Sequence, residues 1–348
     1  MPGELIDDKV RVSDQKEGCQ LFNKGNFGYP LRGGGSDLDL IEATFLLECR
    51  RLEVLSAGRS LGFKEMFTYA SSVSEGFDIR YLVYRDLRQR GFVVKTESGT
   101  FDFSVFPRGS NMSNSRPVYM VRTVFERTAV DITTFSAEIS QSDDKGKQLL
   151  YGVVDEEGDI TYYMMSNKDP RGKVFEEPAR AVEGVLVGSR VLIFDPEQAE
   201  VLRAGGFYGK SLEGMLQLSL IESSHLVSKG LLDIRSLDGL KLSGKDLMQA
   251  GRETQDEFDL RMKAFSALRG RGLVVKTGFK YGTHFRVYEG SPDSCHARYL
   301  VHAVPASEVT MWPEISRTVR LSRGVKKEIL FCRISDRIEF LEFRWFRP

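Results

Sequence analysis

The chain has 348 residues, of which 41% are apolar and 28% charged, a composition typical of a globular protein with two to four compact domains. Lysine plus arginine equals aspartate plus glutamate at 49 each, so the overall charge does not attract nucleic acid. Any nucleic-acid site must therefore be a local basic patch, because physiological salt screens charges beyond roughly 8 Å.

The sequence shows no sign of secretion or of membrane insertion. No stretch approaches the ~18 apolar residues that a membrane-spanning helix needs, and the amino terminus lacks the pattern of a signal peptide. The four cysteines are scattered, without a CxxC pair or metal-ligand spacing. We therefore expect a cytoplasmic protein with reduced thiols, no membrane partner and no bound metal.

The chain contains an internal repeat. Residues 84–96 (YRDLRQRGFVVKT) resemble residues 265–277 (FSALRGRGLVVKT), and residues 38–47 (LDLIEATFLL) resemble residues 218–227 (LSLIESSHLV). Further matches pair Lys147 with Lys327, again about 180 residues apart. Two collinear versions of one unit, here called copy one and copy two, explain this spacing.

Each copy is expected to contain a small α/β amino-terminal domain followed by a domain with a mixed sheet, which makes the fold class α+β. The predicted domains are 1–75 and 76–170 in copy one, and 183–252 and 253–348 in copy two. A segment rich in charge and proline, 167–183, is the predicted linker between the copies.

Patterns in copy two predict its elements in order. The apolar residues Leu216, Leu218, Leu220 and Ile221 predict a helix. A charged helix is expected at 256–270, ended by glycines, and another at 313–326, opened by a proline. Short strands are expected at 272–277, 283–288, 298–304, 328–334 and 338–346.

Three side chains of copy two are predicted to meet at the ends of neighbouring strands: Tyr288, His296 and Lys327. Cleavage of RNA without a metal needs a base for the ribose 2′-hydroxyl and an acid for the departing 5′-oxygen. It also needs a cation beside the charged transition state. A free tyrosine, with a pKa of ~10, is a poor base unless a nearby cation lowers that value. His284 and His302 are the rival histidines.

The segments KTGFKYG (276–282), FRVY (285–288) and VRLSRGVKK (319–327), together with His296, resemble the catalytic domain of two-repeat archaeal tRNA-splicing endonucleases. The resemblance implies a nuclease-like catalytic domain in which Tyr288 is the general base, His296 the general acid and Lys327 the transition-state stabiliser. It implies precursor tRNA with a bulge-helix-bulge motif as the partner. It also implies a reaction without metal or cofactor that leaves 2′,3′-cyclic phosphate and 5′-hydroxyl ends.

The same resemblance implies two further sites. Arg320, seven residues before Lys327, and a residue near the carboxyl terminus are expected to sandwich an unpaired RNA base; Trp345 fits that second position, with Arg344 as the alternative. Copy one has a predicted β-hairpin at 153–163 with an acidic turn. Its carboxylates are expected to dock on copy two of a partner chain, giving a homodimer: Asp155, Glu156, Glu157 and Asp159.

Copy one is expected to be inactive. The position of Tyr288 is occupied there by Phe106, and that of His296 by Arg116, whereas Lys147 keeps the lysine. Two alternatives stay open for the chain as a whole. One is a non-catalytic, RNA-binding or structural relative; the other is a metal-dependent nuclease, for which only Glu289 and Asp293 lie near the site in the sequence.

Overall fold

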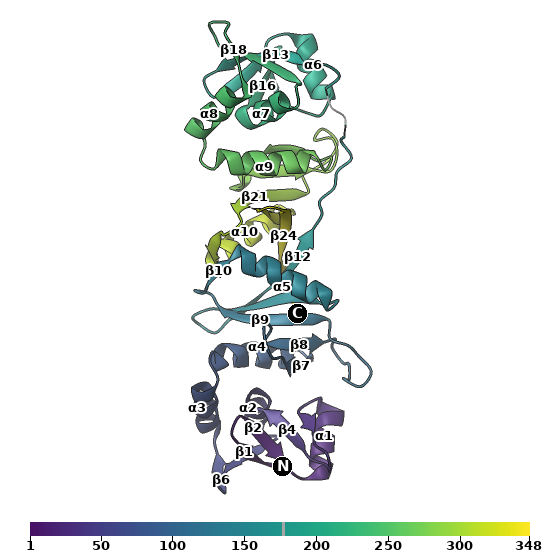
Figure 1. The fold of residues 1–348 in the computed structure, drawn as a ribbon. Helices are drawn as coiled ribbons and strands as arrows, with labels where there is room; N and C mark the ends of the chain where they lie inside the picture. Colours follow the sequence, from purple (N-terminus) through teal and green to yellow (C-terminus); the bar gives the residue numbers. More distant parts are fainter. Residues whose placement is uncertain (176–177) are drawn as a thin grey trace.

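In the computed structural model, which describes residues 1–175 and 178–348, the two copies form one elongated molecule. The two amino-terminal domains lie at opposite ends, and the two carboxyl-terminal domains meet in the middle (Figure 1). The predicted α+β tandem repeat is confirmed. Among the described residues, no helix has the length and apolar character needed to cross a membrane.

Both amino-terminal domains are small six-stranded sheets with helices packed on them. In copy one the sheet order is β3-β4-β2-β1-β5-β6, and in copy two the equivalent order is β15-β16-β14-β13-β17-β18. The elements of copy one are β1 (Pro2–Ile6), β2 (Lys9–Val12), α1 (Gln15–Gly25), β3 (Tyr29–Pro30), β4 (Ser36–Asp39), α2 (Leu40–Glu48), β5 (Glu53–Ser56), β6 (Arg59–Leu61) and α3 (Phe63–Val73). Those of copy two are β13 (Val182–Val187), β14 (Arg190–Ile193), α6 (Pro196–Ala204), β15 (Lys210–Leu212), β16 (Met215–Ser219), α7 (Leu220–Ser228), β17 (Leu232–Arg235), β18 (Lys241–Leu242) and α8 (Gly244–Thr254).

The helix predicted from Leu216 onward begins later than expected. Leu216 and Leu218 belong to strand β16, where both side chains are buried because they alternate on one face of the sheet. Ser219 then starts helix α7, since its hydroxyl accepts a hydrogen bond from the backbone N–H of Glu222 and the Glu222 carboxylate accepts one from the backbone N–H of Ser219. The predicted helix is therefore wrong at 216–219 and right from Leu220.

The carboxyl-terminal domains share one ten-stranded sheet of order β19-β20-β21-β23-β24-β12-β11-β9-β8-β7. The elements of copy one are α4 (Phe77–Gln89), β7 (Val93–Thr96), β8 (Phe103–Phe106), β9 (Tyr119–Phe125), β10 (Ala129–Asp131), α5 (Ile132–Asp144), β11 (Gln148–Val154) and β12 (Ile160–Lys168). Those of copy two are α9 (Phe258–Arg269), β19 (Val274–Thr277), the 3₁₀ turn η1 (Phe279–Tyr281), β20 (Phe285–Tyr288), β21 (Tyr299–Pro305), β22 (Val309–Met311), α10 (Trp312–Gly324), β23 (Glu328–Ile334) and β24 (Ile338–Phe346). The helices and strands predicted from residue 256 to the carboxyl terminus are confirmed, with ends that shift by one or two residues.

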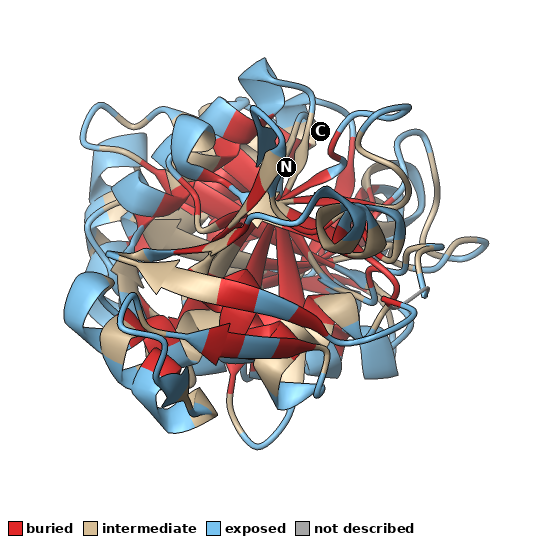
Figure 2. Cartoon of the chain, turned by 90° about the horizontal axis from the view of Figure 1, so that it is seen from above, coloured by how far each residue is buried: buried red, intermediate tan, exposed pale blue. Residues whose placement is uncertain are grey.

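The two copies are joined by a pseudo-twofold strand pair at the centre of this sheet. Strand β12 lies antiparallel to β24, with Tyr162 opposite Phe346 and Lys168 opposite Phe340. Helices α5 and α10 cover the junction, where Trp312 is buried against aromatic rings of copy one. Seen from one end of the molecule, buried residues run along the strands and exposed residues lie on the outer helices and loops (Figure 2).

The predicted linker at 167–183 is shorter than expected and lies along copy two. Strand β12 continues to Lys168, and strand β13 already begins at Val182. Between them, the N–H of Lys173 donates to the carbonyl of Glu289, and the N–H of Val174 donates to that of Gly272. These bonds hold the described part of the linker against the domain that contains Tyr288.

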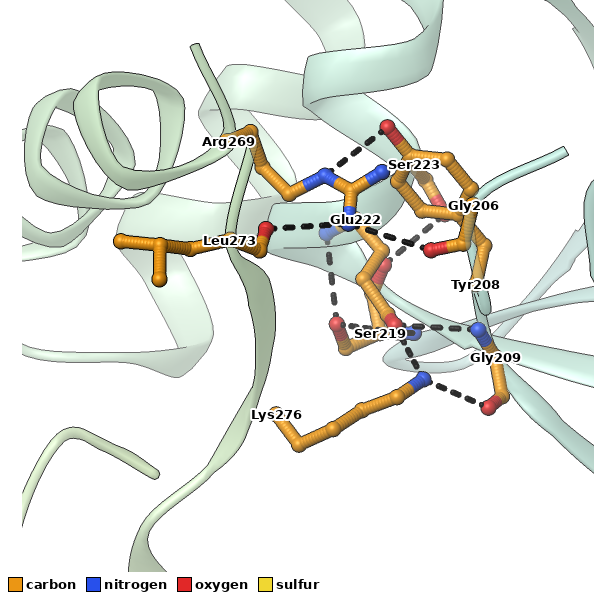
Figure 3. Close-up of polar contacts among 9 residues, drawn as sticks. All are labelled: Gly206, Tyr208, Gly209, Ser219, Glu222, Ser223, Arg269, Leu273 and Lys276. Atoms are coloured by element: carbon orange, nitrogen blue, oxygen red, sulfur yellow. Dashed lines mark hydrogen bonds and ion pairs between the residues drawn. The ribbon is translucent and has the colours of Figure 1, made fainter. Parts of the chain in front are cut away.

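A polar clamp fixes each amino-terminal domain to its carboxyl-terminal domain. In copy two, Arg269 donates to the carbonyl oxygens of Gly206 (3.1 Å) and Leu273 (3.2 Å), and Lys276 Nζ contacts the Glu222 carboxylate at 3.2 Å (Figure 3). In copy one the equivalent pair, Lys95 and Glu42, is buried with Nζ and Oε1 2.6 Å apart. The lysine of the repeated VVKT motif thus contributes an interdomain ion pair in both copies.

Candidate active site

The register of the sheet places Tyr288 and Lys327 at the same end of two strands that flank β21, and His296 lies in the loop at that end. Val287 lies opposite Tyr299, and Tyr299 lies opposite Glu328, so these residues form a row across β20, β21 and β23. Tyr288 follows Val287 as the last residue of β20, Lys327 is the residue just before β23 begins, and His296 lies in the loop that leads into β21. Because neighbouring strands are about 4.8 Å apart, the Tyr288 and Lys327 backbones are separated by about 10 Å.

The three side chains have different surroundings. Lys327 Nζ donates to the carbonyl oxygen of Ala297 at 3.0 Å and lies 5.7 Å from the centre of the Tyr281 ring. His296, the residue before Ala297, is exposed. Tyr288 is 8% exposed in a small cluster with Val274 and Ala297. Lys327 and Tyr288 therefore both approach Ala297, the residue that follows His296, while His296 itself is open to solvent.

Two partly buried side chains from outside the carboxyl-terminal domain pack against the cluster that contains Tyr288. Val174 comes from the linker, and Phe207 comes from the amino-terminal domain of copy two. Phe207 has a positive φ of 60°, which is unusual for a bulky residue. The polar clamp on the neighbouring Gly206 and Gly209 holds this loop in place.

An ion-pair network that the sequence interpretation missed ties together the three segments of the site. Arg298 Nη1 lies 2.7 Å from Glu289 Oε1, and Arg298 Nε lies 2.9 Å from Glu328 Oε1. The hydrogen bond with Glu328 is the main reason that the pKa of the Arg298 guanidinium is raised. Glu289 directly follows Tyr288, and Glu328 directly follows Lys327. We call these three residues the charged triad.

The charged triad is absent from copy one. The positions equivalent to Glu289, Arg298 and Glu328 hold Pro107, Val118 and Gln148. The register confirms the alignment, because Tyr119 lies opposite both Val105 and Gln148, as Tyr299 does opposite Val287 and Glu328. A comparison of charged residues between the two copies would have singled out these three charges in the sequence, but not the contacts between them.

The strand register and a backbone hydrogen bond also confirm which residues of copy one are equivalent to Tyr288 and Lys327. Phe106 lies opposite Val93 as Tyr288 lies opposite Val274. The backbone N–H of Lys147 donates to the Ser142 carbonyl, as that of Lys327 does to the Ser322 carbonyl. Copy one therefore has phenylalanine where copy two has the tyrosine hydroxyl.

The rival histidines, His284 and His302, lie away from the strand ends that hold Tyr288 and Lys327. His284 directly precedes β20, whose far end holds Tyr288, and it accepts a hydrogen bond at Nδ1 from the N–H of Ala303. Burial, aided by the charge of Arg261, lowers the pKa of His284 to about 3 and that of His302 to about 4. Both rings are therefore neutral near pH 7, which leaves them unable to donate a proton as imidazolium.

A basic groove of about 740 Å³ adjoins the lysine of the trio. Five cations line it, together with three aromatic rings and two carboxylates: Arg323, Lys326, Lys327, Arg344 and Arg347; Phe343, Trp345 and Phe346; Glu328 and Glu342. The Arg323 guanidinium stacks on the Trp345 ring, 3.9 Å from its centre. The local basic patch required by the neutral overall charge is therefore present beside Lys327.

The structure places the two predicted base-binding residues in different depressions. Trp345 lines the basic groove, whereas Arg320 lines a separate cavity of about 440 Å³ together with Arg317 and Asp155. The arginine next to Trp345 is Arg323, which lies in the last turn of α10, four residues before Lys327. Arg344, the alternative to Trp345, donates to Met164 Sδ at 2.9 Å.

The acidic turn of copy one is built as a β-hairpin, as predicted. Asp155 Oδ1 accepts hydrogen bonds from the backbone N–H groups of Glu157 (3.0 Å) and Asp159 (2.9 Å), so this side chain shapes the turn. Glu156 forms an ion pair with Arg127. Glu157 and Asp159 are exposed at the tip, where their carboxylates face solvent.

Taken together, the fold and the site define a class of protein. It is a two-repeat α+β protein in which only the second copy has a tyrosine, a histidine and a lysine at one end of neighbouring strands. The family model described as "tRNA intron endonuclease, catalytic C-terminal domain" matches residues 77–162 and 258–340. The model described as "tRNA intron endonuclease, N-terminal domain" matches residues 1–67 and 182–248. The chain therefore belongs to the tRNA intron endonuclease family.

Individual relatives are similar to the chain over nearly its whole length. The tRNA-splicing endonuclease of Methanococcoides burtonii is 34% identical over 342 residues, which cover 97% of this chain and 96% of the relative. That of Methanosarcina mazei is 35% identical over 345 residues, 97% of each chain. That of Halobacterium salinarum is 34% identical over 354 residues, with coverage of 97% and 96%. The predicted family, and with it an endonuclease, is confirmed.

Proposed function

We propose that this endonuclease excises introns from precursor tRNA by cutting at bulge-helix-bulge splice sites, and that the cuts leave 2′,3′-cyclic phosphate and 5′-hydroxyl ends. The observation that supports this best is that Tyr288 and Lys327 lie at the ends of strands on either side of β21, with His296 in the loop that leads into β21 and a basic groove beside Lys327. The names of the relatives support precursor tRNA as the substrate.

In the proposed reaction, the Tyr288 oxygen accepts the proton of the ribose 2′-hydroxyl at the cleavage site. The 2′-oxygen then attacks the adjacent phosphorus, and the bond from phosphorus to the 5′-oxygen breaks. His296, exposed at the edge, donates a proton to the leaving 5′-oxygen. Lys327 uses one of its three N–H groups on the Ala297 carbonyl, which leaves donors for a phosphate oxygen.

The proposed base-binding contacts are Arg320 and Trp345. Trp345 is favoured over Arg344 because its ring already stacks with a guanidinium, that of Arg323, in the basic groove. Stacking between a base and an aromatic ring contributes about 1–3 kcal/mol per base and tolerates any base. Arg320 is separated from this groove, so we propose that it contacts the RNA from the neighbouring depression.

Cleavage of an intron-containing precursor tRNA by the purified chain is expected to continue in excess EDTA, because the proposed acid, base and cation are all side chains. End-group analysis of the fragments should find 2′,3′-cyclic phosphate and 5′-hydroxyl groups. Glu289, a carboxylate that a metal site would need, already contacts Arg298. Cleavage that stops in EDTA and returns with Mg²⁺ would instead support the metal-dependent alternative.

We further propose a homodimer in which the acidic turn of each copy one docks on copy two of the partner. The exposed carboxylates of Glu157 and Asp159 are the part of the turn available for a basic surface. Complementary charge fixes the choice and orientation of a partner more than it adds affinity. Two chains would hold two active sites at a fixed separation, which suits an RNA cut at two bulges.

Reversal of charge at Glu157 and Asp159 to lysine is expected to dissociate the dimer, as measured by sedimentation velocity at low micromolar concentration. Asp155 is left intact, because it accepts two backbone hydrogen bonds within the turn. A matched control is Asp336→Lys in the equivalent turn of copy two, which should leave the dimer intact. If the Glu157→Lys, Asp159→Lys variant stayed dimeric, the turn would be a solvated hairpin tip with no part in the dimer.

A further inference from the structure

The loop between β19 and β20 presents an aromatic side chain to solvent. Phe279, in the 3₁₀ turn η1, is 86% exposed and is followed by Lys280. The loop is internally bonded: the N–H of Tyr281 donates to the Gly278 carbonyl at 2.7 Å, and that of Gly282 donates to the Phe279 carbonyl at 3.1 Å. Gly282 closes the turn with a φ of 62°. The exposure of Phe279 is therefore fixed by a structured turn.

The opposite side of the same turn contacts the active site. The Tyr281 ring is partly buried against the core beneath α10, and its centre lies 5.7 Å from Lys327 Nζ. Only Lys280 separates Tyr281 from Phe279. Because a 3₁₀ turn has three residues per turn, side chains two positions apart point to different sides. Tyr281 thus anchors the turn beside the proposed scissile phosphate, while Phe279 projects outward from it.

The equivalent loop of the inactive copy lacks this feature. Between Thr96 and Phe101, copy one has the sequence ESGT, with an acidic residue and no aromatic. Phe101 itself is 3% exposed and packs in the core at the junction of the copies. The exposed aromatic and the adjacent cation therefore occur only in the copy that has Tyr288, His296 and Lys327.

We propose that Phe279 is a stacking site for an unpaired RNA base next to the cleavage point, with Lys280 beside the backbone phosphate. An exposed ring accepts the face of any base, and an adjacent ammonium attracts the phosphate, which is how proteins commonly bind single-stranded nucleic acid. This site is distinct from the Trp345 groove, since neither Phe279 nor Lys280 lines it. The inference rests on the proposed function, because the ligand of Phe279 would be the same RNA that is cleaved beside Lys327.

The test measures binding of a bulge-helix-bulge RNA that has 2′-deoxyribose at both cleavage sites, so that it lacks the attacking hydroxyl and stays intact. Phe279→Ala is expected to weaken binding about 5- to 150-fold, the range for loss of one base–aromatic stack. Phe279→Trp should restore it. The matched control is Phe194→Ala, which removes another exposed phenylalanine (56%) from the amino-terminal domain of copy two and should leave affinity unchanged. Since Phe279 is almost fully exposed, its removal leaves the core intact.

A second series uses RNAs that each lack the base at one unpaired nucleotide. For one of these RNAs, wild type and Phe279→Ala are expected to bind equally, because the stack is already lost. The proposal is overturned if Phe279→Ala binds the complete RNA as tightly as wild type does, or if its deficit persists with every abasic RNA. The proposed function fails separately, if the wild-type chain does not cut the cleavable precursor.

Discussion

Substitution of His296 by alanine is expected to slow cleavage of precursor tRNA by about 10²- to 10⁴-fold, the usual contribution of a positioned acid or base. The loss should occur in the chemical step, because the leaving 5′-oxygen would depart without a proton. Affinity for the RNA should stay within a few-fold, since His296 is an exposed loop residue outside the basic groove. Single-turnover rates at saturating enzyme, together with binding measurements, separate these two effects.

The chain provides a matched control for this substitution. Arg116 occupies the position of His296 in copy one, and Arg116→Ala should cut at the wild-type rate. His302→Gln should retain the wild-type pH dependence above pH 6, because burial already lowers the pKa of His302 to about 4. A wild-type rate for His296→Ala would remove this histidine from the reaction.

Replacement of Tyr288 by phenylalanine is the second large effect, with an expected loss of about 10²- to 10⁴-fold in the same single-turnover assay. The substitution removes only the hydroxyl that would accept the 2′-proton. Its ring remains packed with Val274 and Ala297. Copy one already has phenylalanine at this position, where Phe106 is 7% exposed, so the sheet accommodates the ring without the oxygen.

The melting temperature of Tyr288→Phe should therefore stay within a few degrees of wild type while the rate falls. The reciprocal change, Phe106→Tyr, should leave the rate as it is, because copy one also lacks the histidine. If Tyr288→Phe cleaved at the wild-type rate, another group would have to accept the 2′-proton, and Tyr288 would not be the general base.

Much of the architecture could be predicted because the chain contains its unit twice. Repeated segments such as VVKT fixed the alignment of the copies, and that alignment predicted that copy one has Phe106 and Arg116 in place of Tyr288 and His296. The sheet register agrees for the tyrosine, because Phe106 lies opposite Val93 as Tyr288 lies opposite Val274. Local patterns were also sufficient for helices α9 and α10 and for the strands of the carboxyl-terminal domain of copy two that lie between and after them.

What the sequence did not predict depends on side-chain geometry between elements. Arg320 matched the expected spacing to Lys327, yet the residue stacked on Trp345 is Arg323, because the direction of a side chain on α10 decides which arginine reaches β24. The charged triad was missed since its members are far apart in the chain and ordinary in type. Leu216 and Leu218 fitted a helix as well as a strand until the start of α7 at Leu220 separated the two.

The strand pair at the middle of the sheet gives copy one a structural role. Without β12, the row of N–H and C=O groups along β24 would be an open edge, and open edges recruit other strands. Trp312 would also lose the rings of Phe135 and Tyr163 that enclose it. Copy one thus supplies, within the same chain, the strand that pairs with β24 of copy two. A polypeptide with a single unit would have to pair this strand with a second molecule.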